Sequence, residues 1–316
     1  MTINEVTASE YAERIERHPH IFNTPAFARL NAHKADSVHY LLLNDNGKTR
    51  FGLILGERGG KLLSPFSAPF GGFSINREQG LEKIDEAVVA LSEYAKKERK
   101  DIRIVLPPQI YAHNLTTSCI NVLSRHARLH HVDLNYYFPI RKFANYTEVL
   151  DRNARNKLRQ AEKNAFEFIA VERDDIDGIR RAYDVIRRNR AEHGYPLRMS
   201  LEDVEATIKI IPADFFLLRH EGEDVAAAQI FHVADGIAQV IYWGDLRAYS
   251  HLRTMNYLAY RIFEYYSHEC LRILDIGPST EDGEPNYGLC DFKTGIGCDV
   301  TPKFVFELLH DDAGLV

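Results

Sequence analysis

The same series of sequence patterns occurs twice along the chain. This repetition constrains the possible folds more than any other feature of the sequence. A strand-forming run from Tyr40 to Leu43 leads into the turn Asn44-Asp45-Asn46-Gly47, and a run from Phe215 to Leu218 leads into Arg219-His220-Glu221-Gly222. The two stretches align without a gap, and their final glycines lie 175 positions apart. Apolar runs on both sides of such turns predict a β-hairpin in each half.

A long helix and a short strand are expected after each hairpin. The first helix is predicted from a cap at Asn76, and the second from about Ser250 to Ser267. Strands at 102–107 and 271–276 follow, and they lie 169 positions apart. Because the two offsets nearly agree, we expect a duplicated unit of mixed twisted sheet and flanking helices, hence an α/β (α+β) protein with a cleft between its halves. Chance similarity of amphipathic segments is the alternative.

Composition describes an ordinary globular chain. The 316 residues are 45% hydrophobic and 27% charged, which is enough for two medium domains. A net charge of -6 argues against a surface built throughout for nucleic acid, so we expect no DNA partner, while a local basic strip stays open. The sequence has neither a basic leader with an apolar core nor a run of about 18 apolar residues, so we expect no transmembrane segment and a cytoplasmic location.

Neither disulfides nor a metal site are expected. Four cysteines occur without any Cys-x-x-Cys pairing: Cys119, Cys270, Cys290 and Cys298. This pattern predicts reduced thiols. His126 and His130 have a spacing that can bind metal on a helix, but no acidic partner or HExxH sequence accompanies them.

The second repeat carries two features that the first lacks, both near strand ends. Asp275 takes the place of Leu106, so an ionisable group there must be solvated, paired or chemically active. Tyr242 and Trp243 end a strand that starts at about Ile237, and Trp243 is the only tryptophan of the chain. Open α/β sheets bind ligands at strand ends, so the second half is the expected seat of chemistry. Purely structural aromatics are the alternative.

One lysine near the end of the chain follows an aromatic residue and precedes two glycines. It is Lys293, which follows Phe292 in the stretch 289–297, Leu-Cys-Asp-Phe-Lys-Thr-Gly-Ile-Gly. A lysine held against a ring at a turn loosened by glycine can stabilise the negative charge that develops in acyl transfer. A solvated loop lysine is the alternative.

The segment that joins the halves is basic in an acidic chain. Between Arg141 and Lys163 there are seven Lys and Arg residues and three acidic ones. A helix capped by Thr147 and ending at about Asn164 would bring three arginines near one face: Arg152, Arg155 and Arg159. Such a face can bind the phosphates of a nucleotide-linked compound or of a tRNA, and a merely solvated face is equally open.

In the first half, an aromatic loop rich in proline and glycine follows a strand. It spans 64–73 and includes Phe70, Gly71 and Gly72, which we assign to substrate or donor binding if the loop forms a wall of the cleft. A rigid connector is the alternative.

Four strings together give the chain a resemblance to a known family. They are RNKLRQAEKNAFEF from Arg155, VAAAQIFHVADGIAQVIYWGDL from Val225, LRTMNYLAYRIFEYYSHECLRILDIG from Leu252 and LCDFKTGIG from Leu289. This ordered set resembles the Fem-type acyltransferases, a bacterial branch of the GNAT N-acyltransferases with two GNAT-like domains. The resemblance spans most of the chain, and we expect domains at 1–144 and 145–316.

The resemblance implies a reaction and roles for residues. The chain would transfer an acyl or aminoacyl group to an amine of a small or cell-wall-precursor-like acceptor, which makes it peptidoglycan-related. The family's Phe-Lys pair stands at the acyl centre, which maps this role onto Phe292 and Lys293. Asp275 or Tyr242 would take the proton of the amine.

The loop before the second long helix departs from the acetyl-CoA pattern Q/R-x-x-G-x-G/A. Residues 247–252, Arg-Ala-Tyr-Ser-His-Leu, keep the arginine, Arg247, without either glycine. No counterpart of the long helical arm of some tRNA-using Fem ligases occurs either. The donor therefore stays open between acyl-CoA and aminoacyl-tRNA, with Arg247 and Trp243 expected near it and no permanently bound cofactor. A non-catalytic module that binds a phosphorylated ligand is the contrasting class, and either a monomer or a dimer is open.

Overall fold

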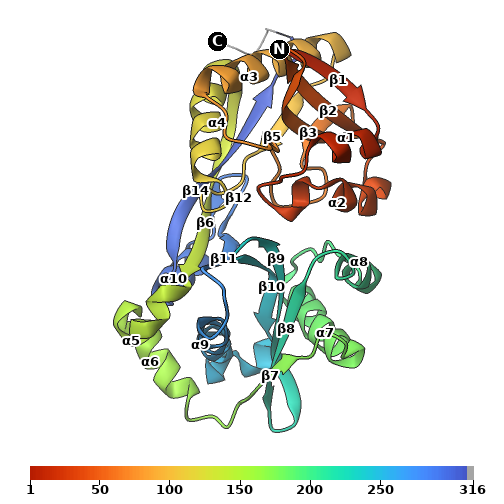
Figure 1. Cartoon of the computed structure of the whole chain (residues 1–316). Coiled ribbons are helices and arrows are strands. Elements are labelled where there is room, and N and C mark those ends of the chain that lie inside the picture. Colours follow the sequence, from red (N-terminus) through yellow and green to blue (C-terminus); the bar gives the residue numbers. More distant parts are fainter. Residues whose placement is uncertain (312–316) are drawn as a thin grey trace. The chain divides into compact units, whose positions relative to one another are not determined.

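The computed structural model describes residues 1–311, which form two compact units (Figure 1). Unit 1 holds Met1–Leu134, Thr280–Glu284 and the described residues from Thr301 onward, and unit 2 holds Asn135–Ser279 and Pro285–Val300. Domains that fold separately at 1–144 and 145–316 stay a prediction. None of the helices in the described part of the chain is both long and apolar enough to span a bilayer.

Unit 1 combines a sheet with four α-helices and two short 3-10 helices among its described residues. Its elements are β1 (Thr2–Val6), α1 (Ala8–Arg14), η1 (Ile21–Asn23), α2 (Pro25–Leu30), η2 (Ala32–Lys34), β2 (Ser37–Asp45), β3 (Lys48–Arg58), β4 (Lys61–Ser64), α3 (Leu81–Glu98), β5 (Ile102–Val105), α4 (His113–His126), β12 (Thr280–Glu281) and most of β14 (Asp299–Leu308).

Unit 2 also combines a sheet with α-helices and short 3-10 helices. Its elements are the end of β6 (Arg128–Pro139), η3 (Ile140–Asn145), α5 (Tyr146–Val149), α6 (Arg152–Ala161), β7 (Glu167–Val171), α7 (Ile176–His193), α8 (Leu201–Thr207), β8 (Ala213–His220), β9 (Glu223–Ala234), β10 (Ile237–Asp245), η4 (Arg247–Leu252), α9 (Thr254–Ser267), β11 (Ile273–Pro278) and α10 (Tyr287–Gly295). The short strand β13 (Glu284–Pro285) begins in unit 1.

The strands of the two units pair in the same order. In unit 1 the order is β1-β2-β3-β4-β5-β14, with β4 and β5 parallel and the other neighbours antiparallel. In unit 2 the order is β7-β8-β9-β10-β11-β6, with β10 and β11 parallel and the other neighbours antiparallel. A long helix, α3 or α9, lies between the two parallel strands in sequence. The predicted α/β class and the predicted duplication are both confirmed.

The two predicted hairpins share the same turn geometry. Asn46 and Gly47 have φ of 50° and 73°, and Glu221 and Gly222 have φ of 50° and 86°. Positive φ at both central residues is the conformation whose twist matches that of the flanking strands, and Asn-Gly adopts it at the lowest cost. Glutamate at position 221 is therefore the strained member of the pair.

Exchanging these first turn residues tests the strain. Glu221→Asn should stabilise the chain by about 0.5 to 1 kcal/mol, and Asn46→Glu should destabilise it by a similar amount, because asparagine tolerates positive φ better than glutamate. Both side chains are exposed, so few other contacts change. Urea unfolding followed by circular dichroism measures both variants. Shifts of the same sign in the two would contradict this account.

The predicted start of the first long helix at Asn76 is wrong, because α3 begins at Leu81. The Asn76 side chain instead binds the chain that follows α1. Its Oδ1 accepts the backbone N–H groups of Glu16 at 2.8 Å and Arg17 at 3.2 Å, and its Nδ2 donates to the carbonyl oxygen of Arg14 at 2.6 Å. A long-range contact thus uses the polar group that the sequence assigns to a helix cap.

Two different helices cover the faces of the unit 2 sheet. Alternate residues of β8, including Phe216 and Leu218, share a core with Leu258 and Phe263 of α9. Helix α7 contacts β8, β9 and β10, and it lies on the other side of these strands from α9 (Figure 1). Because successive strand residues face opposite sides, neighbouring residues of β10 meet different helices.

Candidate functional site

Strands β10 and β11 pair along only part of their length. Their parallel pairing runs from Ile237 and Ile273 to Gln239 and Asp275, whereas β10 continues to Asp245 and β11 to Pro278. The end of β11 therefore has backbone groups that β10 does not satisfy. Buried backbone carbonyls need another partner, and this requirement organises the site.

Phe292 and Lys293 lie in helix α10, so the predicted glycine-loosened turn at this position is wrong. The helix begins after Asn286, whose side chain accepts the N–H of Leu289 at 3.0 Å. Gly295 still belongs to the helix, and a glycine with positive φ, +91°, comes only at Gly297. A regular helix therefore fixes the direction of the Lys293 side chain.

The Lys293 ammonium group fills the gap left at the end of β11. The residue is only 2% exposed, and Nζ donates to the carbonyl oxygens of Ile276, Gly277 and Pro278 at 3.2, 2.9 and 2.9 Å. Three successive carbonyls can converge because β11 is irregular between Asp275 and Gly277, and Gly277 has a φ of +78°. These contacts use all three donors of an ammonium group.

The charge of Lys293 is held where little water reaches it. Burial lowers its pKa from the ordinary 10.5 to about 8, and Cys298, Asp275 and Cys290 act in the opposite direction. The Tyr136 ring also lies near the charge, with its centroid 5.5 Å from Nζ. At neutral pH the protonated form therefore predominates, and its field is only weakly screened.

Asp275 lies at the same strand end and is fully buried. Its Oδ1 accepts hydrogen bonds from Asn135 Nδ2 at 2.7 Å and from the N–H of Gly277 at 2.9 Å, and Oδ2 accepts one from Gln239 Nε2 at 2.8 Å. The carboxylate thus holds the irregular part of β11 in place and lies close enough to Lys293 to influence its charge.

Phe292, the residue before Lys293, forms an aromatic pair with Trp243. Their ring centroids are 6.0 Å apart at an interplanar angle of 64°, and both pack against the core that contains α9. Tyr242 belongs to the other face of β10, where the guanidinium of Arg190 in α7 lies 4.9 Å from its ring centroid. The structure therefore places Lys293 close to Asp275 and Phe292 against Trp243, and it leaves Tyr242 on the opposite face of β10.

Sequence reasoning missed the polar neighbours that complete the site. Asn135 and Gln239 bind Asp275, and Tyr136 packs near Lys293. Burial raises the pKa of Tyr136, and a hydrogen bond with Cys290 adds to this effect. The sequence did contain a signal for them, because an asparagine and a glutamine occur within otherwise apolar predicted strands. Buried amide side chains need specific hydrogen-bond partners.

The predicted basic helix from Thr147 to Asn164 is wrong as a single element. It is divided into α5 and α6, because Leu150 is extended and Asp151 caps a new helix by accepting the N–H of Ala154 at 2.6 Å. All three predicted arginines lie in α6. Arg152 and Arg159 are exposed, and Arg155 donates to the carbonyl oxygen of Leu150 at 3.2 Å.

Arg247 is bound within unit 2 rather than free for a ligand. The backbone N–H of Arg247 donates to Glu192 Oε2 at 2.8 Å, and its side-chain Nη2 donates to the carbonyl oxygen of Glu192 at 2.9 Å. The start of α9 is also occupied, because Thr254 Oγ1 donates to the buried carboxylate of Asp245. A carboxylate here lies where a helix N-terminus would otherwise attract a phosphate, so this start is a poor pyrophosphate site.

Phe70, Gly71 and Gly72 are parts of the unit 1 interior. Phe70 is fully buried, with its ring centroid 4.7 Å from that of His20 and 4.6 Å from that of Tyr111. The N–H of Gly72 donates to Ser64 Oγ at 2.9 Å, and a Cβ added at Gly71 would lie 2.6 Å from the same oxygen. A binding role for this loop stays a prediction.

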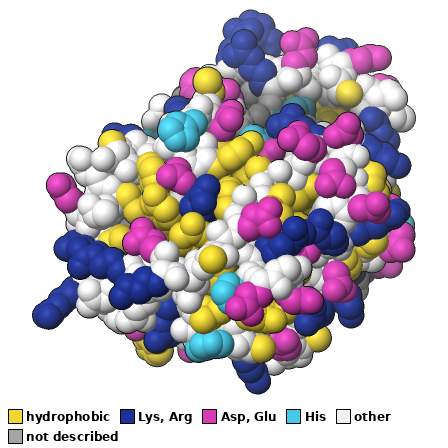
Figure 2. All heavy atoms as spheres, turned by 90° about the horizontal axis from the view of Figure 1, so that it is seen from below, with side chains coloured by type: hydrophobic (Ala, Val, Ile, Leu, Met, Phe, Trp, Pro, Cys, Tyr) yellow, Lys and Arg dark blue, Asp and Glu magenta, His cyan; other side chains and the backbone are white. Residues whose placement is uncertain are grey.

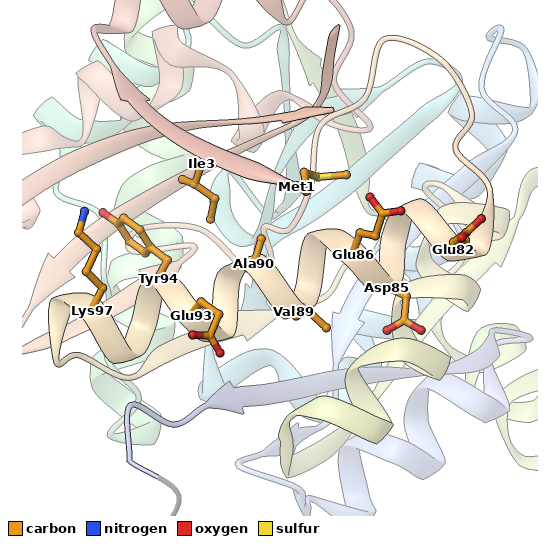
Figure 3. Close-up of a pocket in the computed structure, with 10 residues that line it drawn as sticks. All are labelled: Met1, Ile3, Glu82, Asp85, Glu86, Val89, Ala90, Glu93, Tyr94 and Lys97. Carbon is orange, nitrogen blue, oxygen red and sulfur yellow. The ribbon is translucent and has the colours of Figure 1, made fainter. Parts of the chain in front are cut away.

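A groove of about 590 Å³ lies on unit 1, between α3 and the start of the chain (Figure 3). Two of the four acidic side chains that line it, Asp85 and Glu86, have close hydrogen-bond partners. Asp85 accepts from Arg125 at 2.8 Å and lies 2.6 Å from His126, and Glu86 accepts from Lys83 at 2.7 Å. These carboxylates therefore offer no strong acid or base chemistry.

Charge of both signs is mixed on the face seen in Figure 2, where Lys and Arg side chains alternate with Asp, Glu and hydrophobic ones. A long stretch of nucleic-acid backbone is bound by a continuous row of basic side chains. Any nucleic-acid binding on this face would therefore use local clusters of Lys and Arg.

Comparison with known proteins identifies the fold. No family model and no curated protein sequence matches the chain. Solved structures do match: FemX at a TM-score of 0.68 and 13% identity, over 98% of this chain and 97% of that chain. The C-terminal domain of a putative lysylphosphatidylglycerol synthetase from Agrobacterium fabrum matches at a TM-score of 0.62 and 12% identity, over 97% of this chain and 94% of that chain.

A third similar structure is a tandem GNAT protein from the clavulanic acid biosynthesis pathway. It matches at a TM-score of 0.53 and 10% identity, over 96% of this chain and 97% of that chain. The order and direction of strand pairing in both units agree with two GNAT-like repeats. The chain therefore has the tandem GNAT-like fold of the Fem-type acyltransferases.

Proposed function

We propose that the protein is an N-acyltransferase that moves an acyl or aminoacyl group onto an amine. The observation that carries this proposal is the buried ammonium group of Lys293, held at the end of β11 with the ring of Tyr136 near its charge. Acyl transfer builds negative charge on the carbonyl oxygen of the donor, and a fixed positive charge in a poorly hydrated place stabilises it.

Lys293 can act through its field and through one hydrogen bond. Its contact to Ile276 is the longest of the three, at 3.2 Å. In our mechanism this donor passes to the oxygen of the tetrahedral intermediate, while the bonds to Gly277 and Pro278 hold the ammonium in place. The amine nitrogen forms a bond to the acyl carbon, the bond to the donor's oxygen or sulfur breaks, and one proton leaves the amine for the departing group.

The donor that this proposal favours is an aminoacyl-tRNA. The carboxylate of Asp245 at the start of α9 opposes a pyrophosphate there, and the exposed arginines of α6, Arg152 and Arg159, suit a nucleic-acid backbone. Both this donor and acyl-CoA are cytoplasmic compounds, so we assign the reaction to the cytoplasm. For the acceptor we propose a small or cell-wall-precursor-like amine.

A direct assay separates the donors. Purified protein is incubated with tRNA charged with labelled amino acids, or with labelled acetyl-CoA, and with a set of amine acceptors. We expect label to pass to an acceptor from the tRNA, and we expect tRNA affinity to fall steeply with salt. Transfer from acetyl-CoA alone would reverse the choice of donor.

The contrasting function is a non-catalytic module that binds a phosphorylated ligand through α6. It would show saturable ligand binding without transfer from any donor. Arg155 already donates to Leu150, so such a site would depend mainly on Arg152 and Arg159. Replacing these two by methionine should then abolish binding, whereas in the enzyme it should weaken the donor interaction and leave the chemistry with saturating donor intact.

Truncating the ring of Phe292 tests its predicted role at the acyl centre. Phe292→Ala should lower kcat/KM about tenfold or more by loosening the donor, because small displacements of reacting groups are costly. It should also cost about 1 to 2 kcal/mol of stability, since the ring is only partly buried.

Two variants make this result specific. Phe292→Leu restores most of the apolar volume without a ring, so we expect stability near the wild type and kcat/KM still reduced. Trp243→Phe keeps an aromatic edge for Phe292 and should remain close to the wild type in both. Equal activity of Phe292→Ala and the wild type would remove Phe292 from the site.

A further inference from the structure

Arg190, near the end of α7, lies against the rings of two tyrosines. Its guanidinium carbon lies 4.9 Å from the ring centroid of Tyr242 and 5.8 Å from that of Tyr195. Helix α7 is fixed to β10 here, because Asn189 Nδ2 donates to the carbonyl oxygen of Asp245 at 2.7 Å. The position of the guanidinium is therefore defined by the fold and not by a flexible surface.

This cation has no counter-ion among residues 1–311. None of the described carboxylates forms an ion pair with Arg190, and its buried Nε has no hydrogen-bond partner. Two other arginines of the same helix are paired, Arg181 with Asp224 at 2.7 Å and Arg187 with Asp184. Burial also lowers the pKa of Arg190, which marks an uncompensated charge.

We propose that Arg190, framed by Tyr195 and Tyr242, binds an oxyanion, a carboxylate or a phosphate, carried by the acceptor. A guanidinium that packs against aromatic rings still has N–H groups along its edge, and two parallel hydrogen bonds from this edge to an oxyanion are its strongest interaction. Assignment of the anion to the acceptor rests on the proposed function, but anion binding itself does not.

The neighbourhood of Arg190 agrees with an acceptor site. Tyr242 Oη accepts the N–H of Arg198 at 3.1 Å and keeps its own hydrogen to donate to an anion. Tyr242 is also the chain neighbour of Trp243, which lies beside Phe292. Because Tyr242 and Trp243 point to opposite faces of β10, the amine of an acceptor bound by Arg190 would have to pass the end of this strand to reach Phe292 and Lys293.

Titration of the full chain tests the proposal without any acyl donor. The Nε–H signal of Arg190 in ¹⁵N spectra is assigned by its loss in Arg190→Met, and it is followed during addition of inorganic phosphate, acetate or chloride. We expect a saturable shift with phosphate, acetate or both, but not with chloride. Phosphate alone would indicate a phosphorylated acceptor, and acetate alone a carboxylic acid.

Matched variants distinguish this site from general surface charge. Arg190→Lys should bind about tenfold more weakly, since it loses the planar fork. Arg188→Met removes an exposed arginine from the same helix and should bind as the wild type does. The proposal is overturned if neither anion shifts the signal more than chloride does. Anion binding without acyl transfer would instead contradict the proposed enzyme and leave this site standing.

Discussion

Replacing Lys293 by methionine should slow acyl transfer by about 10² to 10³ fold, the usual effect of removing one group that stabilises an oxyanion. Methionine has nearly the same length as lysine and no charge, so it removes the field and the hydrogen bonds while filling the space. Transfer is measured with saturating and limiting donor. We expect the loss in kcat, because the interaction is made with the transition state.

The stability of this variant should change less than its activity. Methionine leaves three carbonyl groups, those of Ile276, Gly277 and Pro278, without their donor, which costs about 1 to 3 kcal/mol for each fully buried group. It also removes the cost of burying an ammonium charge, and the two effects oppose each other. Lys293→Ala adds a cavity to the lost bonds and should lose about 2 to 4 kcal/mol more, so alanine is the poorer test of chemistry.

The pH dependence gives the same role an independent readout. Burial lowers the pKa of Lys293 to about 8 in the folded chain, below the ordinary 10.5. Between these values the unfolded chain binds more protons, so stability should rise with pH by roughly 3 kcal/mol across this range. The rate should fall above pH about 8 as the ammonium is lost. Lys293→Met should lack both effects.

Lys142 provides the matched control. It is a partly buried lysine of unit 2 that donates to Asp299 at 2.5 Å and to the carbonyl oxygen of Gly297 at 3.4 Å. Like Lys293, it therefore places an ammonium group on a backbone carbonyl. Lys142→Met should keep transfer within about twofold of the wild type, as expected for a surface ion pair. A folded Lys293→Met protein that transfers at the wild-type rate would exclude the role proposed for Lys293.

The elements that sequence predicted well are those set by local chemistry. The hairpins follow from Asn46-Gly47 and Glu221-Gly222, whose conformation depends on the turn residues themselves. The order of elements along the second half was predicted because that half repeats the first. The duplication therefore allowed patterns recognised in single segments to predict the organisation of the whole chain.

The errors arose where distant segments compete for the same group. Asn76 has the composition of a helix cap, yet its side chain binds the backbone near Arg14 and Glu16. Asp151 ended the expected basic helix by capping a new one, and its neighbour Gly295 accepts its N–H at 3.1 Å. Each choice depends on residues far along the chain, which a local pattern does not contain.

The candidate site was predictable as a set of residue types and not as a geometry. Lys293 and Asp275 could be recognised in the sequence as charged residues next to apolar ones. The contact between Lys293 and three carbonyls depends on the irregular strand at Gly277, sixteen positions earlier, and on the incomplete pairing of β10 with β11. Such backbone irregularity follows from packing, because no side-chain pattern specifies it.

Substitutions of Asp275 should have the largest effect on stability in unit 2. Asp275→Ala leaves the donors of Asn135, Gln239 and Gly277 buried without an acceptor, and it leaves the charge of Lys293 without its nearby carboxylate. We expect a loss of about 3 to 5 kcal/mol, the range for removing one member of a buried charged network. Urea unfolding of the intact chain measures it.

Asp275→Asn keeps the shape and should cost much less. The amide it introduces can donate to the side-chain oxygen of Gln239 or Asn135, because both oxygens are buried without a hydrogen-bond partner and either amide can rotate. The lost negative charge should lower the pKa of Lys293 further, since Asp275 now raises it. The alkaline fall in rate should then move to lower pH.

This shift separates two roles for Asp275. If its carboxylate positions β11 and supports the charge of Lys293, Asp275→Asn should transfer at a modestly reduced rate below the new fall and recover as the pH is lowered. If it takes the proton of the amine, the rate should drop by about 10² to 10⁴ fold at every pH. Its burial and its three hydrogen bonds favour the first outcome. A uniform loss of rate in a variant as stable as expected would establish the second.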